Sequence, residues 1–95
     1  MSENTSPTLL DASGRVAFVT GATGGIGQAV VRMMLNAGAK VAATGRREVP
    51  FDDDRVLPLT LEVTDEDAVA SAVQRCVDTY GRLDYVIHMA GMVGK

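Results

Sequence analysis

The sequence predicts an α/β fold in which helices cover both faces of a parallel β-sheet. Short apolar runs of strand length alternate with longer amphipathic stretches of helical period, which is the order expected of β-α-β units. The runs are mostly apolar, and the first of them suits a strand that is buried on both faces. A cluster of glycines also stands directly between the first strand and the first helix. With 95 residues, the chain can form one domain at most.

The first half of the chain is predicted to form one β-α-β unit. Residues 15–20 (RVAFVT) are an apolar run between two glycines and are predicted as the first strand. Residues 40–44 (KVAAT) are predicted as the second strand, and Gly38 ends the helix between them. This helix is expected to bury an apolar stripe at helical spacing: Ile26, Ala29, Val30, Met33, Met34 and Ala37.

The second half supplies two more strands and a second helix. Residues 56–61 (VLPLTL) are the third predicted strand, and Pro58 favours a position at the edge of the sheet. Thr64 is predicted to cap a helix over 65–80 that has three acidic residues in its first turn. Residues 83–90 (LDYVIHMA) are the fourth predicted strand.

The connection between the second and third strands is short. Residues 45–55 are fewer than a parallel crossover with a full helix normally requires. We expect one helical turn or an irregular loop there, and we interpret the acidic run at 52–54 as a solvated loop surface. Right-handed crossovers then give the strand order 3-2-1-4.

Composition excludes several classes of function. The net charge is -3 and aromatic residues make up only 4% of the chain, so the sequence offers neither a basic stripe nor a stacking platform for nucleic acid. A single cysteine and a single histidine rule out an internal disulfide and an obvious metal cluster, and Cys76 is predicted to be a core residue. No apolar stretch is long enough to span a membrane. Residues 1–13 are mostly polar, which predicts a flexible arm on a soluble, cytoplasmic protein.

The glycine cluster carries the strongest functional signal. It follows a predicted strand and opens a predicted helix, which is the context of a Rossmann-type dinucleotide-binding turn. Gly21 allows the sharp turn, Gly25 lets the backbone approach a pyrophosphate, and Gly27 lets helix and strand pack closely. The phosphates would lie on free N–H groups at the positive end of the helix, whereas the alternative is a turn without a ligand. We expect valine at Gly21 or Gly27 to harm cofactor binding more than folding.

Beyond residue 13, the chain resembles the short-chain dehydrogenase/reductase family. The family's T-G-x-x-x-G-x-G turn is met by Thr20, Gly21, Gly25 and Gly27. Its D-V-x-D, F/Y-G-x-L-D and N-N-A-G segments correspond to residues 62–65 (EVTD), 80–84 (YGRLD) and 88–91 (HMAG). Gly24 also fits the T-G-x-x-G-x-x-G turn of the family's extended members, and the YGRLD segment favours the short-chain subgroup.

The resemblance implies a set of cofactor-binding residues. Glu62 stands where the family has an aspartate that faces the adenine amino group, and His88 and Met89 replace two asparagines. We assign no chemistry to His88 and expect a hydrogen-bonded core residue. The candidate cofactor-binding residues are Gly21, Thr23, Gly24, Gly25, Ile26, Gly27, Arg46, Arg47, Glu62, Val63, Met89, Ala90 and Gly91.

The end of the second predicted strand bears on the choice of cofactor. NAD-binding domains place an Asp or Glu there for the ribose hydroxyls, whereas Arg46 and Arg47 follow this strand. A guanidinium can hold a 2′-phosphate through paired hydrogen bonds. Arg46 is therefore the candidate 2′-phosphate ligand with Arg47 in support; the alternative is a pair of exposed loop residues. NADP is the predicted cofactor, with NAD as the alternative.

The residues that would carry the reaction are not in this sequence. The family's catalytic serine and Tyr-x-x-x-Lys pair follow the segment that the chain resembles, and neither Tyr80 nor Tyr85 has a lysine four residues on. We assign no catalytic and no metal-binding residue, and we expect residues 14–95 to be the N-terminal part of a domain, inactive alone.

The resemblance implies hydride transfer between NADP(H) and a carbonyl or alcohol substrate. It also implies partnership with the remainder of the domain, on the same or another chain, and a homo-oligomer when the domain is complete. The alternative function is a non-catalytic dinucleotide-binding or scaffolding module.

Overall fold

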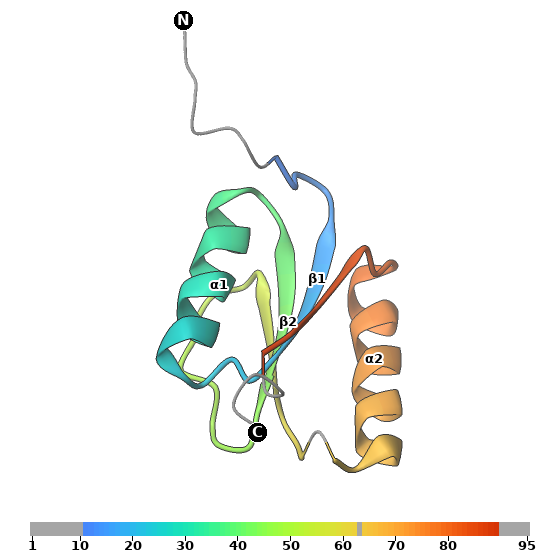
Figure 1. Ribbon diagram of the computed structural model, residues 1–95. Coiled ribbons are helices and arrows are strands. Elements are labelled where there is room, and N and C mark those ends of the chain that lie inside the picture. Colours follow the sequence, from blue (N-terminus) through green and yellow to red (C-terminus); the bar gives the residue numbers. More distant parts are fainter. Residues whose placement is uncertain (1–10, 63, 90–95) are drawn as a thin grey trace, which may run out of the picture.

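The computed structural model describes residues 11–62 and 64–89, which form one parallel sheet and two helices. In chain order, the elements are β1 (Val16–Thr20), α1 (Gly25–Asn36), β2 (Lys40–Gly45), β3 (Val56–Thr60), α2 (Glu66–Tyr80) and β4 (Tyr85–His88). The strands lie in the order β3-β2-β1-β4, as predicted, and all neighbouring pairs are parallel. The helices cover opposite faces of this sheet (Figure 1).

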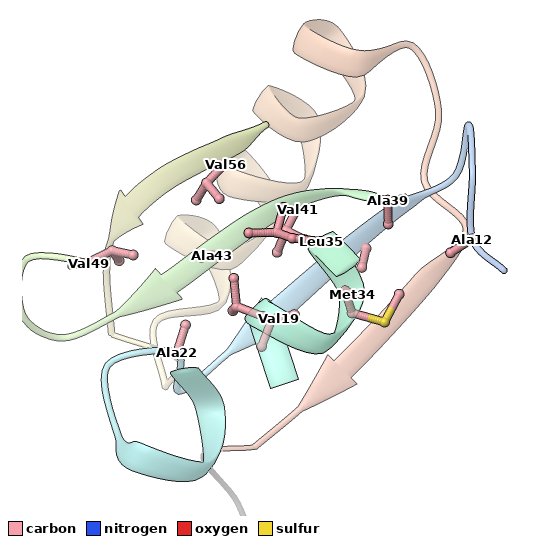
Figure 2. Packing of buried hydrophobic residues seen from close by; sticks show 12 residues of the cluster. Ala12, Val19, Ala22, Met34, Leu35, Ala39, Val41, Ala43, Val49 and Val56 are labelled. Atoms are coloured by element: carbon pink, nitrogen blue, oxygen red, sulfur yellow. The ribbon is translucent and has the colours of Figure 1, made fainter. Parts of the chain in front are cut away.

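The sheet separates two apolar cores. Every residue of β1 is buried and, because successive side chains of a strand point to opposite faces, β1 contributes to both cores. Ala17 and Val19 belong to the core beside α1, whereas Val16 and Phe18 belong to the core beside α2. Figure 2 shows the first of these cores, in which side chains of the sheet meet those of α1 and of the loop after β2. The largely apolar sequence of β1, in which Thr20 is the one polar residue, thus reflects burial on both sides.

The face that α1 buries differs from the predicted apolar stripe. Its buried residues are Gly27, Val31, Met34 and Leu35. Ile26 and Met33, both in the predicted stripe, are 68% and 51% exposed. The cause is Gly27, because a Cβ there would overlap the carbonyl oxygen of Gly21. The glycine must face the sheet at close range, which fixes the rotation of the helix.

An irregular loop joins β2 to β3, in agreement with the short connection in the sequence. Val49 of this loop is buried, and Phe51 packs partly against the core beside α1. The guanidinium of Arg55 pairs with Asp53 at 2.9 Å and also donates at 3.1 Å to the carbonyl oxygen of Leu35 in α1. The loop is thereby fastened to the end of α1. The other two acids of the run at 52–54 are exposed, as predicted.

The N-terminus of α2 lies one residue later than predicted. Asp65 is the N-cap, and its side chain accepts a hydrogen bond from the N–H of Ala68 at 3.1 Å. The prediction of Thr64 as the cap was wrong; aspartate is the stronger capping residue, and its charge also complements the helix dipole. Cys76 is fully buried, as predicted. Gly81 ends the helix with φ 82°, a conformation that glycine adopts without steric cost.

A carboxylate fixes the start of β4. Asp84 accepts the N–H of Val16 at 2.8 Å, and its own N–H donates to the carbonyl oxygen of Val16 at 2.9 Å. Arg82 holds the same carboxylate at 2.7 Å and keeps the pKa of Asp84 below its usual value. The strand is four residues long, shorter than predicted, and Ala90 at its predicted end lies outside the described residues.

Residues 11–13 pack against the domain, although the sequence places them in the N-terminal arm. Ala12 is fully buried, and its N–H donates to the carbonyl oxygen of Ala37 at 2.8 Å. The flanking polar residues Asp11 and Ser13 are exposed, which explains why the sequence suggests a flexible arm at this point. Residues 1–10, the remainder of the predicted arm, lie outside the described part of the chain.

Candidate functional site

The glycine turn and the ends of all four strands meet at one edge of the sheet. In a parallel sheet, the carboxyl ends of the strands share an edge, and ligands of open α/β sheets bind there. The turn is fastened to β2 because the N–H of Ala22 donates to the carbonyl oxygen of Thr44 at 2.8 Å. At the end of β4, the N–H of Met89 donates to Oγ1 of Thr20 at 3.1 Å. Candidate residues from distant parts of the sequence are thus brought together.

Two glycines of the turn are required by the fold itself. Gly21 has φ 70°, in the left-handed region that side chains strain. A Cβ at Gly27 would overlap the carbonyl oxygen of Gly21 and lie 2.9 Å from Cα of Ala22. Because these obstacles are backbone atoms, no change of rotamer could relieve them. The expectation that valine at Gly27 would harm binding more than folding was therefore wrong.

Gly24 and Gly25 are different, because the fold does not need a glycine at either position. Gly24 has an ordinary extended backbone, with φ -78° and ψ 167°. A Cβ at Gly24 would meet no atom closer than 4.0 Å, and one at Gly25 would meet nothing within 4 Å. The space in front of these two residues is open, and side chains would fill it.

The same space lies at the positive end of α1. The first N–H groups of a helix have no acceptor within the helix, and the N-cap Gly24 has no side chain that could supply one. The first turn of α1 also contains no acidic residue. Free N–H groups facing an open space at a helix N-terminus suit a phosphate or pyrophosphate.

Thr23 and Gln28 hold the turn in this shape. Nε2 of Gln28 donates to the carbonyl oxygen of Thr23 at 2.9 Å. The side chain of Thr23 lies against Gly45, where a Cβ would come within 2.5 Å of its Cγ2. Sequence analysis missed both Gln28 and Gly45. A glycine at the end of a strand indicates a close approach of another segment, so Gly45 could have been found from the sequence.

Arg46 and Glu62 follow neighbouring strands and lie side by side. Gly45 at the end of β2 pairs in register with Thr60 at the end of β3, and the N–H of Leu61 donates to the carbonyl oxygen of Gly45 at 2.8 Å. Nε of Arg46 consequently lies 3.9 Å from Oε2 of Glu62. Arg47, the predicted supporting cation, is exposed.

His88 makes a hydrogen bond at the end of β4. Its Nδ1 lies 2.8 Å from Oγ1 of Thr20, the same oxygen that accepts the N–H of Met89. The hydrogen bond was expected, but the predicted burial was wrong. His88 is exposed because it lies on the same face of β4 as Val86, which is itself 64% exposed.

Three candidate residues, Val63, Ala90 and Gly91, lie outside the described part of the chain. Within residues 11–62 and 64–89, no group of three or more His, Cys, Asp or Glu side chains is arranged to hold a metal ion. Neither helix of this part has the length and apolar character needed to cross a membrane.

Comparison with known proteins gives one consistent result. A family model described as short chain dehydrogenase matches residues 15–95. Oxidoreductase BOA17 of Botryotinia fuckeliana (strain B05.10) is 37% identical over 84 residues, a match that covers 81% of this chain and 31% of the relative. Ipsdienol dehydrogenase of Ips pini is 35% identical over 79 residues, with coverage of 81% and 31%.

Solved structures agree with this result. A 3-ketoacyl-(acyl-carrier-protein) reductase from Brucella melitensis matches with a TM-score of 0.75 and 26% identity over 80% of this chain and 34% of that one. A mutant short-chain dehydrogenase/reductase from Serratia marcescens matches with a TM-score of 0.75 and 36% identity over 84% and 36%. The chain thus spans about a third of the length of these relatives. Its sheet order, its glycine turn and the family match over residues 15–95 lead to one conclusion: the chain belongs to the short-chain dehydrogenase family.

Proposed function

We propose that the chain is the cofactor-binding part of an oxidoreductase that transfers hydride between NADP(H) and a carbonyl or alcohol substrate. The observation that carries this proposal is the open space in front of Gly24 and Gly25, where the fold itself does not require glycine. The Brucella melitensis relative was solved in complex with NADH, which supports a nicotinamide cofactor. When bound, the nicotinamide would give or accept the hydride.

The residues of this chain would bind and orient the cofactor. The N–H groups at the start of α1 would hold the pyrophosphate, and Gln28 would keep the turn in shape through its bond to Thr23. The exposed side chain of Ile26 offers apolar surface beside the same turn. By resemblance, residues 62–63 would contact the adenine, and residues 89–91 would line the cofactor at the end of the fourth strand.

Arg46 supports NADP over NAD. Its side chain is 76% exposed and can reorient toward a ligand at the carboxyl edge of the sheet. A guanidinium forms paired, charge-assisted hydrogen bonds with a phosphate, whereas an aspartate at the same position would repel it.

The test of this assignment is a titration of the full chain and its Arg46→Asp variant with NADP and with NAD. We expect the Kd for NADP to rise about thirtyfold or more, because charge-assisted hydrogen bonds are lost and repulsion is gained. The matched control is Arg47→Asp, which should change the NADP-to-NAD ratio less. An unchanged ratio in Arg46→Asp would contradict the assignment.

We also propose that β4 forms a second pairing with polypeptide from the remainder of the domain. Among the described strands it pairs with β1 alone, and Val86 on one of its faces is 64% exposed. Unpaired edges of apolar strands promote aggregation. Amide exchange on residues 1–95 alone should therefore show weak protection over residues 85–88. Strong protection there in a monomer would favour the alternative, a self-sufficient binding module without turnover.

A further inference from the structure

We infer that Glu62 is a specificity-determining residue that competes with the cofactor for Arg46 and so limits the preference for NADP over NAD. The inference rests on the proposed function, because it takes Arg46 as the ligand of the 2′-phosphate. The observation behind it is the approach of Arg46 Nε to Glu62 Oε2 at 3.9 Å.

The backbone places these two side chains together. The register of β2 and β3 ends with Gly45 opposite Thr60, and the bond from the N–H of Leu61 to the carbonyl oxygen of Gly45 extends this pairing by one step. Arg46 and Glu62 directly follow Gly45 and Leu61, just beyond the ends of β2 and β3. An acid therefore stands beside the end of β2 after all, although it is supplied by the segment that follows the neighbouring strand.

The position of the pair relative to the glycine turn connects it to the cofactor. Gly45, directly before Arg46, is in contact with the side chain of Thr23 in the turn. A dinucleotide whose pyrophosphate lies on the start of α1 would extend its adenosine end toward this side of the edge, as in other Rossmann-type domains. The ribose 2′ position is the part of the molecule in which NADP and NAD differ.

The pair affects the two cofactors differently. A 2′-phosphate would have to take Arg46 from Glu62, so NADP binding must break the pair. A 2′-hydroxyl carries no charge and leaves the pair intact, so Glu62 stays free to face the adenine of NAD, as the family resemblance implies. Glu62 thus weakens NADP binding and favours NAD.

The size of the effect is limited by solvent. The side chains of Arg46 and Glu62 are 76% and 54% exposed, and exposed ion pairs are weak. Removal of the competing charge should therefore change affinity about two- to fivefold. The length of the side chain also contributes, since the shorter aspartate would draw its carboxylate away from Arg46.

The experiment is a double-mutant cycle on the full chain, with Kd values for NADP and for NAD measured by calorimetric titration at low salt. Glu62→Gln and Glu62→Asp should each raise the NADP-to-NAD affinity ratio about two- to fivefold. This gain should disappear when Arg46 is Met, because the competitor then has nothing to hold. Glu48→Gln is the matched control, since it removes another exposed acid close to Arg46 in sequence and should leave the ratio unchanged.

Two results would overturn the inference. An unchanged ratio in Glu62→Gln would show that the carboxylate does not compete, and the same gain in the Arg46→Met background would show that it acts without Arg46. Both differ from failure of the proposed function, in which Arg46→Met by itself would leave the NADP-to-NAD ratio as in the parent chain. Thermal unfolding of each variant would confirm that the changes are in binding and not in folding.

Discussion

The two helices begin at the same edge of the sheet but treat their N-termini in opposite ways. In α2, the Asp65 side chain accepts the N–H of Ala68, and two acids stand in the first turn. In α1, the N-cap is Gly24, without a side chain, and the first turn has no acid. Both N-termini carry the same partial positive charge. In α2, carboxylates of the helix itself balance this charge, whereas the start of α1 has none.

This difference agrees with the phosphate site proposed at the start of α1. A carboxylate at the start of α1 would stabilise the helix but would repel a phosphate. Glycine also lowers helix stability, so Gly25 is an unfavourable choice for α1 unless something else must occupy its space, whereas glycine is tolerated at the N-cap position of Gly24. Within the glycine turn, the same contrast appears between glycines that the fold requires and glycines that it does not.

The largest effect is expected at Gly27. Gly27→Ala would place a Cβ into the carbonyl oxygen of Gly21, so α1 could no longer pack at this distance from β1. Overpacking of this kind costs about 1–3 kcal/mol, and the rigid backbone obstacle places this case at the upper end. Urea unfolding should show a large drop in the free energy of unfolding. A drop below about 0.5 kcal/mol, the range of ordinary surface substitutions, would contradict the close packing.

Gly25→Ala is the matched substitution two residues earlier. Its Cβ would meet nothing within 4 Å, and alanine is the better helix former, so stability should stay the same or rise by up to about 1 kcal/mol. Dinucleotide affinity should fall about tenfold or more, because the methyl group would fill the space proposed for the pyrophosphate. Calorimetric titration beside urea unfolding would separate the two effects. Unchanged affinity in a stable Gly25→Ala variant would remove the main support for the cradle.

The strands and their order could be predicted because each depends on local information. Apolar runs set the strands, and connection length with crossover handedness gives the order of the sheet. The rotation of α1 could not be predicted, because the sequence contains two apolar stripes that overlap at Met34. Only the contact between Gly27 and Gly21, which exists once the turn has formed, selects between them.

The candidate site divides in the same way. Its glycines were predictable, since their chemistry depends on the backbone around them. The pairing of Arg46 with Glu62 was not, because it follows from the register of β2 on β3, across a loop without regular structure. Likewise, the exposure of His88 depends on how far α2 extends across the sheet, and the sequence of a strand does not reveal this.

A moderate effect is expected at the satisfied N-terminus of α2. Asp65→Ala removes the acceptor of the Ala68 N–H and should lower the free energy of unfolding by about 1 kcal/mol. Thr64→Ala is the matched control, because the structure gives the capping role to Asp65, and it should change stability by less than about 0.5 kcal/mol. Dinucleotide affinity should not change in either variant if α1 alone holds the phosphates. If Thr64→Ala proved the more destabilising of the two, the assignment of the cap would be wrong.

The smallest effect is expected at the opposite edge of the sheet, where another carboxylate satisfies a backbone N–H. Asp84→Asn keeps one oxygen that can accept the N–H of Val16, but it loses the charge, and its NH2 group cannot accept the second hydrogen bond from Arg82. The pKa of Asp84 is lowered in the folded state, chiefly by the hydrogen bond from Arg82. Its charge therefore stabilises the fold above the unfolded value of about 3.9, and this contribution is lost as the pH falls through the lower folded value.

The parent chain should thus be slightly more stable than Asp84→Asn at pH 7, and the gap should close below about pH 4. The lowered pKa of Asp53, which arises mainly from Arg55, acts equally in both proteins and cancels in the difference. Urea midpoints measured from pH 7 to pH 2.5 would test this. A gap that persists in acid would mean that Asp84 acts through the shape of its hydrogen bonds and not through its charge. A gap that closes would support the view that the carboxylates at the cap of α2 and at the start of β4 serve the fold, while the start of α1 stays open for the proposed ligand.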